Sequence, residues 1–98
     1  MTLQVANTIL AQLGGNRFVA MTGAKNLLGS ERGLSFKVGT NAKKVTHVRI
    51  GLEPSDEYTV EFLTIRGTNI KRTALREGVQ VAELRDVFTA ETGLYTSL

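Results

Sequence analysis

The 98-residue chain has no cysteine, no tryptophan, one proline and one histidine. Without cysteine it can form neither a disulfide nor a thiolate metal site, and a reducing cytoplasm is the default expectation for its location. Its apolar runs are far shorter than the roughly 18 residues of a membrane helix. Met1 is not followed by the basic segment and apolar run of a signal peptide. We therefore expect a cytoplasmic protein without a membrane span, and the length predicts a single domain over residues 1–98.

The residues that usually carry catalysis or bind metals are also scarce. His47 alternates with apolar residues, so we expect it on an exposed sheet face and outside any catalytic constellation. The acidic turn at 53–57 has too few oxygen ligands for a calcium loop of the EF-hand type. No serine lies in a GxSxG motif, and neither the P-loop motif nor GxGxxG is present. The sequence predicts no enzyme, no cofactor and no metal site.

The segment 45–74 has the pattern of an antiparallel β-hairpin that carries most of the core. Apolar and polar residues alternate over 48–52 and again over 58–65, which is the period of a strand with one buried face. The link between these arms, 53–57, contains the single proline followed by serine and aspartate, which favour a turn. We expect this hairpin to organise the fold.

The rest of the chain supplies two amphipathic helices and further strands. Apolar residues at helical spacing predict a helix over 2–13, with Thr2 as N-cap and Gly14-Gly15 as its end, and a second helix over 79–92 that ends at Gly93. Further elements are predicted as a strand at 17–21, a glycine-rich loop at 23–33, and strands at 34–38 and 70–75. The fold class is therefore α+β: an N-terminal helix, an antiparallel meander of about five strands and a C-terminal helix, with both helices packed on one sheet face.

The sheet face opposite the core is the candidate functional surface. Alternation places Lys37, His47, Arg49 and Glu61 outward, and a set from 70–75 joins them. The full set of candidate partner-binding residues is Lys25, Arg32, Lys37, His47, Arg49, Glu61 and Lys71. The net charge of +3 is compatible with a polyanionic partner. Pairing of Glu61 with Arg49 or Lys71, and the lack of outward aromatic residues, weaken the nucleic-acid interpretation. A solvated ion-paired face, a nucleic-acid site and a protein-binding site all remain open.

Leu63 and Ile65 depart from this alternation, because they share the outward phase of Glu61. A β-bulge near Leu63 would reset the register. Coverage of this end of the strand by the segment containing Leu27 and Leu28, or by a partner or a second copy, would also explain it.

Three segments resemble a group of short proteins carried by phages and other mobile elements. These segments are QLGGNRFVAMTGAKN (12–26), VRIGLEPSDEYTVEFLTIRGT (48–68) and ELRDVFTAETGLYTSL (83–98). The resemblance covers most of the chain and implies a setting, the cytoplasm of a host cell, but no residue roles. Small proteins of this class often act by stoichiometric binding. The resemblance therefore implies a non-enzymatic protein that occludes a host or phage protein complex, most concretely an anti-defence inhibitor of the anti-CRISPR kind. The alternatives are a basic nucleic-acid-binding accessory protein and a structural homo-oligomer subunit.

Overall fold

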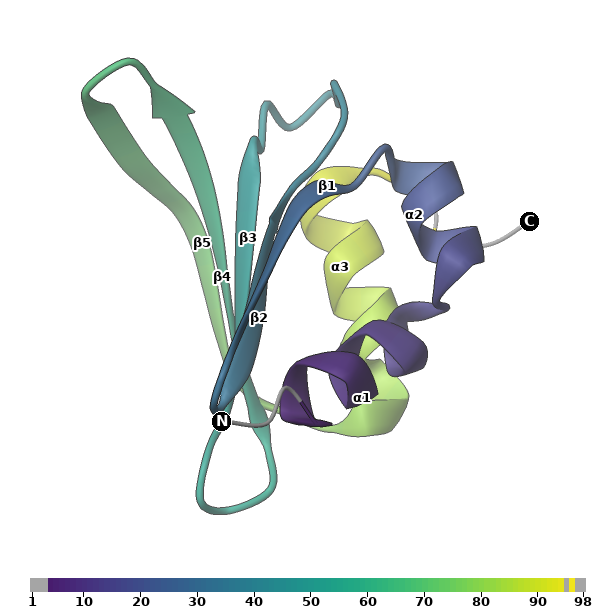
Figure 1. The fold of residues 1–98 in the computed structure, drawn as a ribbon. Coiled ribbons are helices and arrows are strands. Elements are labelled where there is room, and N and C mark those ends of the chain that lie inside the picture. Colours follow the sequence, from purple (N-terminus) through teal and green to yellow (C-terminus); the bar gives the residue numbers. More distant parts are fainter. Residues whose placement is uncertain (1–3, 95, 97–98) are drawn as a thin grey trace.

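The computed structural model describes residues 4–94 and Thr96. Over these residues the chain forms three helices, a short 3₁₀ turn and five strands (Figure 1). In chain order these are α1 (Gln4–Leu13), α2 (Asn16–Thr22), β1 (Lys25–Ser30), β2 (Gly33–Lys37), β3 (His47–Leu52), β4 (Tyr58–Arg66), β5 (Asn69–Val79), η1 (Val81–Glu83) and α3 (Leu84–Thr92). The helices pack on one face of the sheet, as Figure 1 shows, so the predicted α+β class is confirmed.

The sheet is a simple meander in the order β1-β2-β3-β4-β5, with each strand antiparallel to its neighbours. The predicted central hairpin is present as β3 and β4, in which Val48 pairs with Phe62 and Ile50 with Val60. Its turn is closed by a hydrogen bond from the Glu53 N–H to the Glu57 carbonyl at 2.8 Å. Short turns between consecutive antiparallel strands explain why the chain needs no crossover connection.

Two neighbouring predictions near the N-terminal end of the sheet are wrong. The segment 17–21 is not a strand but lies within helix α2, and the predicted loop at 23–33 contains strand β1. Helix α2 lies between Gly15 and Gly23, which have φ angles of 61° and 67°. A five-residue apolar run fits either a helix or a strand, so its period decides nothing. Every residue of β1 is exposed, so this edge strand has no apolar alternation to reveal it.

The other boundaries agree more closely with the sequence pattern. Helix α1 matches the prediction over the described residues, while Thr2 lies outside them. Strand β5 continues to Val79, beyond the predicted strand at 70–75. The C-terminal helix therefore begins later than predicted, after the turn η1, and ends before Gly93 as expected. No helix in residues 4–94 is long and apolar enough to cross a membrane.

Three phenylalanines join the helices to the sheet at the centre of the core. Phe18 of α2 packs edge-on against Phe36 of β2, with ring centroids 5.3 Å apart, and against Phe88 of α3 at 5.2 Å. All three rings are at most 2% exposed. Edge-to-face pairs of this kind add about 0.5–1.5 kcal/mol each to the free energy of burial. Around them pack the apolar stripes of α1 and α3 and the inward residues of β2, β3 and β4.

We predict that Phe18→Ala lowers the free energy of unfolding by about 3–5 kcal/mol, because it leaves a cavity where two aromatic contacts meet. Phe18→Leu should cost less, roughly 1–2 kcal/mol, and keeps the test usable if the alanine variant does not fold. Urea denaturation followed by circular dichroism measures both. Leu28→Ala is the control, since Leu28 is 68% exposed. Equal stability of the Phe18 variants and the control would contradict this account of the core.

A second prediction concerns Gly33 and Gly51, which pair directly across β2 and β3. A Cβ atom on Gly33 would clash with the backbone oxygen of Ile50, whereas a Cβ on Gly51 would meet no heavy atom within 4 Å. Gly33→Ala should therefore destabilise the protein, on the order of 1–3 kcal/mol. Gly51→Ala should stabilise it by roughly 0.4–1 kcal/mol, because alanine restricts the unfolded chain. Thermal and urea unfolding of the two variants provide the comparison, and destabilisation by both would refute it.

Candidate functional site: the open face of the sheet

We call the face of the sheet opposite the helices the open face. Strand register places its side chains in rows that cross the sheet from β1 to β5. The central row consists of residues that are successive cross-strand partners: Leu28, Ser35, Arg49, Glu61 and Leu75. It is apolar at its two ends and charged in the middle.

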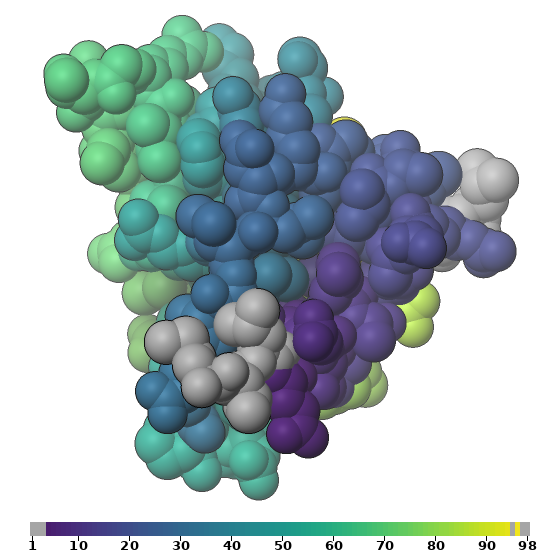
Figure 2. Space-filling model, viewed as in Figure 1, coloured from purple at the N-terminus to yellow at the C-terminus, as the bar shows by residue number. Residues whose placement is uncertain are grey.

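The neighbouring row is the basic row. Its members, again successive cross-strand partners, are Lys25, Lys37, His47, Leu63 and Arg72. Beyond this row the β4–β5 hairpin continues past the end of β3, where Ile65 pairs with Ile70. Figure 1 shows this hairpin projecting at the upper left, and in Figure 2 its turn stands clear of the rest of the molecule. The open face therefore combines cations with apolar side chains from both edges of the sheet.

One carboxylate holds two arginines on the open face. Arg49 Nη1 lies 3.5 Å from Glu61 Oε1, and Arg72 Nη1 lies 3.4 Å from Glu61 Oε2. The two arginine side chains remain 61% and 54% exposed. Ion pairs this exposed contribute about 0–1 kcal/mol to stability. Glu61 therefore orients the two arginines but binds them only weakly.

The expected place of Lys71 on this face is not what the structure shows. The pairing of β4 with β5 shifts between Phe62 and Leu63, so that Phe62 pairs with Ala74 and Leu63 with Arg72. Thr73 is the extra residue of this bulge, and its hydroxyl donates to the Phe62 carbonyl at 3.2 Å. The register next to the β4–β5 turn, which pairs Ile65 with Ile70 and Leu63 with Arg72, puts Arg72 on the open face and Lys71, opposite Thr64, in the helix-side phase. The bulge then brings Leu75, and not Ala74, opposite Glu61. Arg72 therefore takes the place that the candidate set gave to Lys71.

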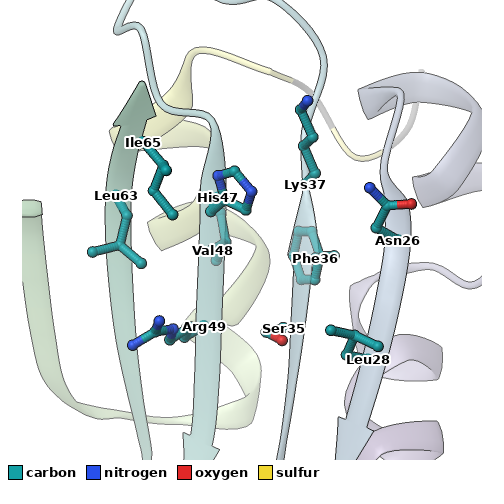
Figure 3. Close-up of a pocket in the computed structure, with 10 residues that line it drawn as sticks. All are labelled: Asn26, Leu28, Ser35, Phe36, Lys37, His47, Val48, Arg49, Leu63 and Ile65. Carbon is teal, nitrogen blue, oxygen red and sulfur yellow. The ribbon is translucent and has the colours of Figure 1, made fainter. Parts of the chain in front are cut away.

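The bulge does not explain why the apolar residue Leu63 lies in the outward phase. It lies in β5 and does not change the phase of β4, so Leu63 stays on the open face opposite His47. Leu63 is 3% exposed there, while Leu28 on β1 is 68% exposed and lies on the far side of a hollow. The segment 27–28 is thus part of an edge strand and leaves the hollow open (Figure 3).

Two adjoining hollows follow strand β2 on this face, with volumes of about 310 and 350 Å³. They share Leu28, Ser35 and Arg49. We call the combined depression the trough. It forms because two outward residues of β2 are small: Ser35, between Leu28 and Arg49, and Gly33, between Ser30 and Gly51. In the close-up of Figure 3, Leu28 borders it from β1 and Arg49 borders it from β3.

The ionisable residues that line the trough are all basic. They are Lys37 and His47 at one end, Arg49 in the middle and Arg32 at the other end. Burial lowers the pKa of His47 from 6.5, and the nearby charges of Lys37 and Arg49 lower it further. The Thr46 hydroxyl lies 2.7 Å from His47 Nδ1 and orients the ring. An electropositive site that keeps its imidazole neutral is suited to an anionic ligand.

The structure brings most of the predicted site residues together. Lys25, Lys37, His47, Arg49 and Glu61 share the open face, and Arg32 lies in the β1–β2 turn at the end of the trough. Lys71 is the exception. The candidate set left out four residues of the face, namely Leu28, Ile70, Arg72 and Leu75. Alternation alone left open whether Lys71 or its neighbours Ile70 and Arg72 point outward, and the register of the β4–β5 hairpin decides for the latter. The bulge at Thr73 decides the phase of Leu75, and no turn or glycine signal marks it in the sequence.

No group of three or more histidine, aspartate and glutamate side chains in the described residues could hold a metal ion. Comparison with models of protein families, with curated proteins and with solved structures finds no match. Function is therefore inferred from the geometry and chemistry of the open face.

The electrostatics of the trough can be checked through His47, the only histidine of the chain. We predict a folded-state pKa below 6.5, with burial as the first cause and Lys37 and Arg49 as the next. Because the unfolded state then binds the proton more readily, His47 stabilises the fold above about pH 6.5, and this contribution is lost as pH falls through the lowered pKa. Titration of the imidazole proton signals by NMR measures the value.

Lys37→Gln should raise the His47 pKa part of the way toward 6.5, because burial still acts after the charge is removed. Lys71→Gln removes the same charge from the opposite phase of the sheet and should leave the titration unchanged. An equal effect of both variants would show that overall charge, and not the trough, sets the pKa.

Proposed function

We propose that the protein is a non-enzymatic binding protein that docks a partner protein on the open face of its sheet. The observation that carries this proposal is the combination of exposed apolar side chains with two partly free arginines on one face. Leu28, Ile70 and Leu75 are 68%, 65% and 39% exposed, although each belongs to a strand of the sheet. Burial of such side chains by a partner is favourable at about 25 cal/mol per Å² of apolar surface.

The composition of the face favours a protein partner over nucleic acid. Arginine is enriched in protein interfaces, and Arg49 and Arg72 lie between the apolar ends of the rows. In the described part of the chain the aromatic rings lie on the helix side, so none can stack on bases. Glu61 in the middle of the face would repel a phosphate backbone. Leucine and isoleucine side chains gain little from contact with phosphates and sugars.

The face is also a better docking surface than either edge of the sheet. Strand β1 has an irregular register between Lys25 and Leu28, and β5 has one shift between Tyr58 and Val60 in its pairing and another at Thr73. Bulges of this kind interrupt the row of backbone donors and acceptors that an added strand needs. The edges therefore disfavour strand addition.

Electrostatic repulsion argues against a homo-oligomer that stacks two open faces. The central row and the basic row hold four Lys and Arg side chains, Lys25, Lys37, Arg49 and Arg72, but one carboxylate, Glu61. Two such faces would bring like charges together, which costs affinity at an interface. A partner with an acidic surface is the complementary choice.

The resemblance of the sequence to short proteins of phages and mobile elements supports a host protein complex as the partner. Stoichiometric occlusion needs a surface and no catalytic group, which fits the chemistry of the open face. A host defence complex is the most concrete case of this proposal, with the protein acting as an inhibitor.

The test compares glutamate substitutions on and off the open face. Leu28→Glu and Ile70→Glu each place a carboxylate on the face, whereas Val81→Glu changes a residue that is 51% exposed in the turn η1. Tagged wild type and Val81→Glu should retain the same protein from a lysate of cells that carry the gene. The purified partner should bind in a fixed ratio by calorimetry, and each open-face variant should weaken its affinity at least about tenfold, as for a buried apolar anchor.

Retention of the partner by both open-face variants would contradict the proposal. If duplex or single-stranded nucleic acid displaces the wild type from its partner, and its affinity falls steeply with added salt, the result would support the nucleic-acid alternative instead. A stable oligomer of the purified protein in light scattering would support the structural-subunit alternative.

A further inference from the structure

We propose that the trough along β2 receives a short acidic segment of the partner protein, with one aliphatic side chain of that segment seated against Leu28 on the β1 side of the trough. This inference rests on the proposed function and adds the chemistry of the partner. Its basis is the shape of the trough, its apolar border and its charge.

The shape of the trough suits an extended segment. Its floor follows β2, whose five residues span about 13 Å along the strand at the usual rise per residue. This length matches four to five residues of extended chain. The sheet is hollowed at Gly33 and Ser35 because neither residue fills the space between the side chains of β1 and β3. Gly33 cannot be replaced freely, because a Cβ there would meet the Ile50 backbone oxygen.

The exposed apolar border of the trough is Leu28, which lines both hollows. Leu28 borders the trough from β1, whereas Leu63 and Ile65 line the first hollow from β4, on the far side of β2 and β3 (Figure 3). Asn26 and Ser35 supply polar groups beside Leu28. An aliphatic side chain of a partner seated here would cover Leu28, the most exposed large apolar residue of the protein's described part. An apolar anchor in a pocket bordered by polar groups is the usual form of an interface hot spot.

The charge of the trough indicates which residues of the partner segment flank its aliphatic side chain. Arg49 lines both hollows, Lys37 lines the first and Arg32 lines the second. No described residue that lines either hollow is a carboxylate, because Glu61 lies on the β4 side of Arg49. Arg49 lies opposite Ser35, and Lys37 follows two residues later on β2. Carboxylates at alternate positions of an extended segment, about 6–7 Å apart, can therefore meet both cations.

The chain's own acidic turn fits the trough less well than an acidic segment of another protein. The turn at 53–57 supplies Glu53, Asp56 and Glu57, so a second copy could offer negative charge. Between these residues lie only Pro54 and Ser55, so the turn has no aliphatic side chain to place against Leu28. Glu57 is also held by Gln80 Nε2 at 2.6 Å.

The experiment uses the full chain labelled with ¹⁵N and three synthetic hexapeptides with blocked ends. The first alternates aspartate and leucine, the second has asparagine in place of aspartate, and the third has alanine in place of leucine. The first peptide should shift the amide signals of residues 33–37 and 47–51 in a saturable way. The other two should bind at least about fivefold more weakly, since each lacks one of the two required features.

Variants locate the binding within the trough. Ser35→Leu fills the floor and should abolish the shifts, while thermal melting checks that the variant is folded. Arg49→Gln and Lys37→Gln should each weaken the first peptide about twofold to fivefold, the usual range for an exposed ion pair. Lys71→Gln is the matched control, because it removes the same charge from the helix-side phase of β5.

Four results would overturn the inference: no shifts with any peptide, equal shifts with the asparagine peptide, shifts of the same amides by an oligothymidylate alone, or shifts on dilution that reveal self-association through the trough. Binding of the captured partner to two variants distinguishes failure of this inference from failure of the proposed function. If Ser35→Leu keeps the partner while Ile70→Glu loses it, the partner docks on the open face but outside the trough. If both variants keep it, the proposed function fails as well.

Discussion

The contact of Phe18 with Phe36 and Phe88 is the constraint on which the rest of the structure depends. It joins α2, β2 and α3 at one point, and the apolar stripes of the helices complete the same side of the sheet. A five-stranded sheet covered on one face only must expose the other. The exposed face is therefore a consequence of where the aromatic core formed, and its side chains are free to serve binding.

The chemistry of the open face depends on cross-strand register more than on any single motif. Register sets Ser35 between Leu28 and Arg49, which hollows the sheet along β2. It also sets Glu61 between two arginines, which keeps them extended over the face while their charges stay largely available. Small residues along β2 thus produce a depression with basic and apolar borders. We propose that such a depression recognises acidic segments with an aliphatic anchor better than a uniform polyanion.

Much of the fold was predictable, and the two errors have physical reasons. The β3–β4 hairpin followed from strict alternation, because a half-buried antiparallel strand shows its two faces directly in its sequence. The segment 17–21 has a short apolar run that suits both periods, and its helical state depends on Phe18 reaching the ring of Phe88. Strand β1 is exposed along its whole length, so its strand state rests on pairing with β2 rather than on any pattern of its own.

The sequence by itself determined which side chains of β2, β3 and β4 point away from the core, and so it identified Lys37, His47, Arg49 and Glu61. This was possible because alternation along one strand is a local property. Only the tertiary structure decided that Arg72 and not Lys71 completes the face, because the pairing of β4 with β5 sets which residue of β5 lies opposite Leu63. It alone decided that Leu28 and Arg49 border a trough, because neighbours across a sheet are set by register between strands far apart in the sequence.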